Sequence, residues 1–130
     1  MKRREFIEKS GCGFAGVVAA GSGLESTGGG SQARRSYDIE IEIYENKNNR
    51  NCHKVGEKFK YREDIGKICP WFLSSMWDFI RVLENGGIMT WKYEGTPYEK
   101  VIDPDGVTTE FVRCPDPTGN LVAKITRTAK

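Results

Sequence analysis

Two segments of the chain alternate apolar and polar residues, which is the pattern of a strand with one buried face. Residues 37–43 place Tyr or Ile at every second position, with Asp or Glu between them. Residues 57–61 repeat the alternation over a shorter length. Because successive side chains of a strand point to opposite faces, both segments predict half-buried strands. The polar residues 47–51 between them predict a loop.

Residues 70–85 predict a helix. Pro70 stands at its first position and Gly86-Gly87 follows its last, and both are typical start and stop signals. The apolar residues between them recur at spacings of three and four, which gives one wide apolar face. They are Phe72, Leu73, Met76, Trp77, Phe79, Ile80 and Leu83. We interpret this face as core packing against a sheet rather than as a cofactor site.

Three more strands are predicted after the helix, over residues 88–93, 107–112 and 120–126. Residues 103–106 predict a turn, because a proline fixes one dihedral angle and a glycine tolerates positive φ. The succession of strands around a single helix predicts an α+β fold. We expect a small antiparallel or mixed sheet of about five strands, with one helix packed across one face.

The first residues have the features of a targeting segment. Arg3-Arg4, followed by Phe6, resembles the twin-arginine export signal. The apolar stretch that follows, residues 12–24, is broken by four glycines and is too short to span a bilayer. The resemblance implies that the twin-arginine translocase is a partner during export, and that the protein ends up in the periplasm or outside the cell.

Two cleavage sites fit this segment, one after Ala20 and one after Ala33. The second follows the Gly/Ser-rich residues 28–31, which are flexible and accessible to a peptidase. Residues 1–33 are therefore predicted to be a signal peptide with its cleavage region. Residues 34–130 remain as a single small α+β domain. Because the twin-arginine route is associated with folded, often cofactor-loaded cargo, the resemblance also favours a metal or cluster.

Composition narrows the function classes. The chain has 130 residues and a formal net charge of +2, which is too balanced for a dedicated nucleic-acid binder. No run of about eighteen apolar residues is present, so we expect no stable membrane span. The sequence also lacks a Gly-rich phosphate loop, a nucleophile elbow and an HExxH motif. These observations weigh against a stand-alone enzyme, and no catalytic residue is assigned.

Three cysteines and one histidine carry the candidate chemistry of residues 34–130. Cys69 precedes Pro70, which places it at the helix N-cap, where unpaired backbone amides and the helix dipole favour a thiolate. Cys114 follows a predicted strand and begins a rigid Cys-Pro-Asp-Pro loop. Cys52 and His53 are adjacent in the loop between the first two strands. No CxxC pair is present, so the strong zinc-ribbon signal is missing.

The same residues resemble an uncharacterised family of small three-cysteine proteins. The motifs are Cys-His-Lys-Val-Gly at 52–56, Gly-Lys-Ile-Cys-Pro at 66–70 and Cys-Pro-Asp at 114–116, with Gly86-Gly87 and Trp91 between the last two. The resemblance covers nearly all of residues 37–128. It implies a common fold and a candidate site at the cysteines. It implies no activity, because the family carries none.

Cys52, Cys69, Cys114 and His53 are the predicted metal ligands. Three thiolates and an imidazole would complete a tetrahedral zinc site or hold an iron–sulfur cluster. Because side chains of adjacent residues diverge, three thiolates with an open fourth position are an alternative. The cysteines could instead form a disulfide with one spare thiol, or be inert and buried. A thiol enzyme with Cys69 as its nucleophile ranks last, because no general base accompanies it.

The sequence therefore predicts an exported protein that binds a metal or iron–sulfur centre. It would act as an accessory or electron-transfer component, with an exported redox enzyme as its partner. The rival is a cofactor-free structural or interaction protein, held by one disulfide, that travels with an exported enzyme.

Overall fold

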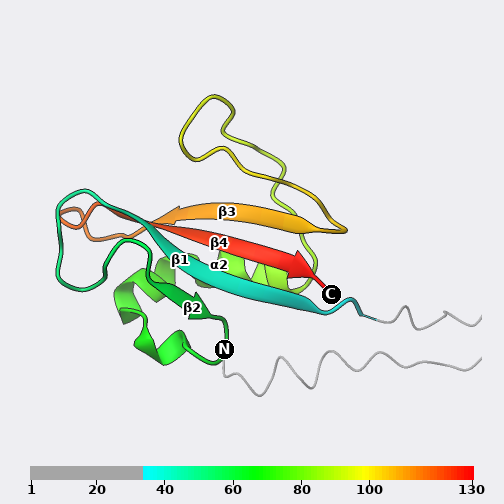
Figure 1. The fold of residues 1–130 in the computed structure, drawn as a ribbon, viewed down its shortest axis with the longest axis horizontal. Coiled ribbons are helices and arrows are strands. Elements are labelled where there is room, and N and C mark those ends of the chain that lie inside the picture. Colours follow the sequence, from blue (N-terminus) through cyan, green and yellow to red (C-terminus); the bar gives the residue numbers. More distant parts are fainter. Residues whose placement is uncertain (1–33) are drawn as a thin grey trace, which may run out of the picture. The chain divides into compact units, whose positions relative to one another are not determined.

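The computed structural model describes residues 34–130, so the predicted signal peptide lies outside the described residues. The elements are β1 (Tyr37–Asn46), β2 (Lys58–Lys60), the 3-10 turn η1 (Ile65–Lys67), α2 (Pro70–Glu84), β3 (Val107–Arg113) and β4 (Leu121–Ala129). The strands form one sheet in the order β2-β1-β4-β3 (Figure 1). All three strand pairs are antiparallel. The predicted α+β class is confirmed, with four strands rather than five.

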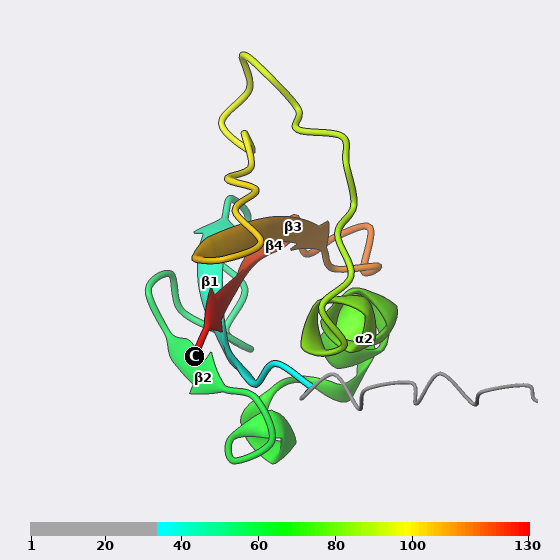
Figure 2. The same ribbon diagram turned by 90° about the vertical axis from the view of Figure 1, so that its right-hand side faces the viewer.

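One hydrophobic core lies between the sheet and α2. Ile39, Ile41 and Ile43 alternate along β1 toward the helix, and all three are buried. In the register, Ile41 is opposite Ile125 of β4, which is itself fully buried. Figure 2 shows α2 beside one face of the sheet. The period-2 alternation of β1 therefore arises from one face that packs on the helix and another that meets solvent.

The helix agrees with its prediction to within one residue. It begins at Pro70 and ends at Glu84, with Asn85 at the C-cap and Gly86 beyond it at φ 81°. Its apolar face is narrower than predicted, because Trp77 is 41% exposed and contacts Tyr61 at the edge of the core. The fully buried residues of the helix are Phe72, Met76, Ile80 and Leu83.

The strand predicted over residues 88–93 is wrong. These residues belong to the long loop between α2 and β3, which projects from the sheet in both views (Figures 1 and 2). The free edge of β3 is met instead by the end of this loop. There the Thr109 N–H donates to the Val101 carbonyl at 2.9 Å, and Ile102 forms a bridge with Thr108. Within residues 34–130, residues 88–93 therefore pair with no strand.

Two ionic groups are buried toward the end of the domain where α2 finishes. Lys100 Nζ lies 2.7 Å from Glu110 Oε2, and both side chains are 1% exposed. Arg127, also fully buried, donates to the carbonyls of Leu83 and Gly87 and to the Thr108 hydroxyl. Its guanidinium therefore binds carbonyls at the negative end of the helix dipole, which offsets its buried charge.

Candidate functional site

All three cysteines of residues 34–130 line one pocket at the end of the domain where α2 begins. Cys52 comes from the β1–β2 loop, Cys69 precedes α2, and Cys114 follows β3. The pocket has a volume of about 420 Å³, and its apolar lining is Trp71, Phe72 and Leu121. Three segments that are distant in sequence thus bring their thiols to one cavity. Cys52 is exposed, Cys69 is intermediate and Cys114 is buried, and none of the three forms a disulfide.

Cys69 occupies the N-cap of α2, as the sequence predicts. Its sulfur makes no capping hydrogen bond, so the side chain does not serve as the helix cap. Its backbone N–H instead donates to Nε2 of His53 at 3.0 Å. The position of Cys69 is therefore set by Pro70 on one side and by a histidine from a distant loop on the other.

His53 is 5% exposed and uses both ring nitrogens. Its Nδ1 lies 3.0 Å from Oε2 of Glu57, and its ring packs edge-on against Phe59 with centroids 5.5 Å apart. Because Nε2 accepts the Cys69 N–H, the neutral ring carries its proton on Nδ1 and donates it to the Glu57 carboxylate. That hydrogen bond lowers the pKa of Glu57. His53 thus orients Cys69, and binding a metal through Nε2 would break this hydrogen bond.

Cys114 is held by the sheet. Its backbone N–H donates to the Leu121 carbonyl at 2.9 Å, which extends the β3–β4 pairing by one residue. Burial raises the pKa of the Cys114 thiol, and the nearby Cys69 and Cys52 raise it further, while a hydrogen bond from the Asp116 backbone opposes the rise. Burial is therefore the main reason that the Cys114 thiol keeps its proton, and the other two cysteines add to it.

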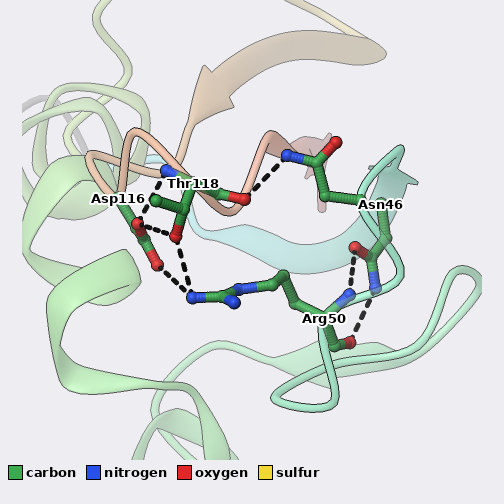
Figure 3. Close-up of polar contacts among 5 residues, drawn as sticks. Asn46, Arg50, Asp116 and Thr118 are labelled. Atoms are coloured by element: carbon green, nitrogen blue, oxygen red, sulfur yellow. Dashed lines mark hydrogen bonds and ion pairs between the residues drawn. The ribbon is translucent and has the colours of Figure 1, made fainter.

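The loop that carries Cys52 is fastened to the β3–β4 turn (Figure 3). Arg50 Nη2 lies 2.8 Å from the Thr118 hydroxyl and 3.3 Å from Oδ2 of Asp116. Asn48 donates its side-chain amide to the Thr118 carbonyl at 2.7 Å. Hydrogen bonds from the Thr118 hydroxyl and N–H, and then from Arg50, lower the pKa of Asp116. We call the set of contacts among Arg50, Asp116, Thr118 and Asn48 the latch.

Asn46, the last residue of β1, hydrogen-bonds to the backbone of the loop that carries Cys52. Its amide accepts the Arg50 N–H and donates to the Arg50 carbonyl, both at 2.9 Å (Figure 3). The same amide nitrogen donates to the His53 carbonyl at 2.9 Å. One side chain thus fixes the loop on both sides of Cys52.

The sequence predicted the three thiols but not the latch or the role of Asn46. The asparagine-rich residues 47–51 predict only a polar loop, because no local pattern in the sequence indicates their contact with Asp116. Within residues 34–130, no group of three or more Cys, His, Asp or Glu side chains lies in an arrangement that would hold a metal ion. The thiols share a pocket without surrounding one point. A bound ion would require a rearrangement, and Cys52, the exposed thiol on a loop, is the one with room to move.

The fold and site together define a small antiparallel α+β domain with a three-thiol pocket. No family model, curated protein or solved structure matches this chain. The resemblance of residues 37–128 to a three-cysteine family therefore stays a prediction. Of the helices in the part that the structure describes, none is long and apolar enough to cross a bilayer.

Proposed function

We propose that this chain is an exported accessory or electron-transfer protein that holds a soft metal ion or an iron–sulfur centre through Cys52, Cys69 and Cys114. The observation that carries the proposal is that these three cysteines, from three separate segments, line one pocket. Thiolates are the ligands that zinc, copper(I) and iron–sulfur clusters share. An exported redox enzyme is the partner such a component would serve.

The protein supplies positioning and charge at this site. His53 orients the Cys69 backbone, the sheet fixes Cys114, and the latch holds the loop of Cys52. Burial first, and the neighbouring Cys69 and Cys52 in addition, raise the pKa of Cys114 and so favour its protonated form while no cation is bound. A bound cation would reverse that balance and drive all three thiols to ionise. His53 would join as a fourth ligand only by giving up the Cys69 N–H.

Elemental analysis tests the proposal. Protein purified without chelator should carry about one equivalent of metal, or one cluster, per chain. Cys52→Ser, Cys69→Ser and Cys114→Ser should each lower that content, whereas Thr90→Ala, on the exposed α2–β3 loop, should not. Less than about a tenth of an equivalent of zinc, iron and copper together would contradict the proposal.

Counting free thiols in denatured protein separates this proposal from the disulfide-held structural protein. A metal site gives three reactive thiols in residues 34–130 once the metal is chelated. A disulfide leaves one reactive thiol until a reductant is added. One free thiol with no bound metal would therefore favour the structural protein.

Export is tested by replacing Arg3-Arg4 with two lysines, which keeps the net charge. The variant precursor should stay in the cytoplasm, because the twin-arginine translocase reads the guanidinium pair. Unchanged yield outside the cytoplasm would contradict the export assignment.

A further inference from the structure

We infer that a second cavity, between the α2–β3 loop and the face of the sheet that α2 does not cover, binds a small aromatic carboxylate. We call this cavity the aromatic pocket. Its volume is about 190 Å³, and its lining residues are Tyr93, Thr96, Tyr98, Phe111, Arg113 and Val122. The aromatic pocket shares no lining residue with the three-thiol pocket, so the inference is independent of the proposed metal site.

The sheet supplies one side of the aromatic pocket. Val112 of β3 belongs to the core that α2 covers, so its neighbours Phe111 and Arg113 point to the opposite face. Val122 of β4 is the register partner of Arg113 and lies on the same face as Arg113. The period of two along β3 therefore places an aromatic ring and a guanidinium next to each other on the face away from the helix.

The loop is fixed over this face by two tyrosine hydroxyls. The Tyr44 hydroxyl donates to the Pro97 carbonyl at 2.9 Å. The Tyr98 hydroxyl donates to Oε2 of Glu45 at 2.7 Å. The Tyr98 ring then packs edge-on against Phe111, with centroids 5.7 Å apart. Contacts within the protein thus hold these two aromatic walls in place before any ligand binds.

The third aromatic wall, Tyr93, has a strained backbone. Its φ is 53°, in the left-handed region that bulky residues rarely adopt. The ring is held from one side by Nζ of Lys100, which lies 5.4 Å from its centroid, and its hydroxyl accepts the indole N–H of Trp91 at 2.8 Å. Tyr93 is still 46% exposed. Strain of this kind is concentrated at ligand-binding sites, because the gain there is a side chain already in position.

The size and lining of the aromatic pocket fit one aromatic ring with a small substituent. An apolar cavity of about 150 Å³ is enough to hold benzene. Three aromatic walls favour an aromatic occupant, because paired rings gain stabilisation beyond their buried area. A ligand rich in hydroxyls would find few partners, since the Thr96 hydroxyl already donates to the Tyr93 carbonyl and accepts the Tyr98 N–H.

Arg113 supplies the charge that selects a carboxylate. Its Nη1 donates to Oδ1 of Asn120 at 3.0 Å, and within residues 34–130 its guanidinium makes no other hydrogen bond and no ion pair. None of the lining residues is acidic. Glu45, which accepts the Tyr98 hydroxyl, also pairs with Lys47 at 3.5 Å. Because a guanidinium binds a carboxylate through two N–H donors, the remaining donors of Arg113 suit the carboxylate of an aromatic acid.

The test is a titration of the full chain with benzoate, followed through the NMR signals of its backbone amides. We expect saturating shifts confined to residues 93–98 and 111–113 and their neighbours. Benzamide has the ring without the charge, and acetate has the charge without the ring. Each should bind at least about 10-fold more weakly than benzoate, because a charged hydrogen bond or the ring contacts are lost.

Two arginine variants locate the charge. Arg113→Gln should weaken benzoate binding by about 10-fold or more. Arg81→Gln makes the same change of charge on the exposed side of α2 and should leave the affinity unchanged.

Three results would overturn the inference. They are shifts that do not saturate, equal affinities for benzoate and benzamide, and an unchanged benzoate affinity in Arg113→Gln. The comparison of the three probes on the unaltered protein decides this even if Arg113→Gln fails to fold. The metal content of the three-thiol pocket is measured separately, so failure of either proposal leaves the other standing.

Discussion

Polar groups of two different kinds lie toward the two ends of α2. Buried charges lie toward the end where the helix finishes, and thiols lie toward the end where it begins. Where α2 finishes, Lys100 pairs with Glu110 and Arg127 binds the carbonyls of the helix end. Where α2 begins, three thiols line a pocket and form no disulfide with one another. At the first end, the one buried side-chain polar atom without a partner, among the described residues, is Nε of Arg127.

The difference separates structural polar groups from candidate functional ones. Buried charges whose partners lie within the same chain are explained by the fold and need no ligand. The three thiols line one pocket, but they form no disulfide with one another. We therefore expect substitutions at the charged end to lower the free energy of unfolding. Substitutions of the cysteines at the other end should instead change metal binding.

The largest loss of stability should follow Lys100→Ala. The change leaves Glu110 buried without its ion-pair partner, and such losses cost about 3–5 kcal/mol in the free energy of unfolding. Urea denaturation measures this. The double variant Lys100→Met with Glu110→Leu should recover most of the loss, because it buries no charge. A single variant as stable as the parent would contradict the account of this end.

Arg127→Met should have the next largest effect. It removes the donors to the Leu83 and Gly87 carbonyls and to the Thr108 hydroxyl, at a cost of about 2 kcal/mol. Metal binding at the other end of the helix should be unchanged. Altered metal content in a folded Arg127→Met protein would show that the two ends are coupled, contrary to the comparison.

Arg50→Gln should barely change stability but should loosen the thiol end. Arg50 and Asp116 form an exposed pair, worth at most about 1 kcal/mol. Amide hydrogen exchange over residues 48–52 should become several-fold faster, because the latch loses its guanidinium. Lys47→Gln is the matched control, since Lys47 pairs only within its own strand-loop segment, with Glu45. Equal exchange rates in the two variants would refute the role of the latch.

The smallest expected effect is a decline in the stability of the metal-free protein at high pH. Because the pKa of Cys114 is raised in the folded state, the native protein keeps this proton at a pH where the unfolded chain has lost it. The metal-free protein should therefore lose stability as the pH rises above the ordinary cysteine pKa of about 8.5. Cys114→Ala should flatten the decline in urea midpoints. An equal slope in both proteins would show that Cys114 does not cause the pH dependence of stability.

These contrasts also show which features local sequence can predict. The alternation along β1 and the spacing along α2 are local periods, so both elements were predicted closely. The strand over residues 88–93 was wrong because pairing depends on which segment reaches the edge of β3, and residues 101–102 take that edge. Propensity within residues 88–93 contains no information about that competition.

The candidate site also combines features that local sequence predicts with features that depend on contacts between distant residues. The three cysteines stood out as residue types, and the position of Cys69 followed from the proline after it. The contact between Arg50 and Asp116 spans 66 residues and has no local signature. The burial of His53, between Glu57 and the Cys69 amide, likewise depends on how the β1–β2 loop meets the start of α2.

The central claim is that Cys52, Cys69 and Cys114 act as one site, and thiol protection tests it most directly. The reduced, metal-free protein is mixed with one equivalent of Cd²⁺, a soft ion that thiolates bind, and its unprotected thiols are alkylated and assigned by mass spectrometry. The account predicts that all three cysteines become protected together at one equivalent. Protection of only one or two of them, with the remainder alkylated as fast as in the metal-free protein, would contradict it.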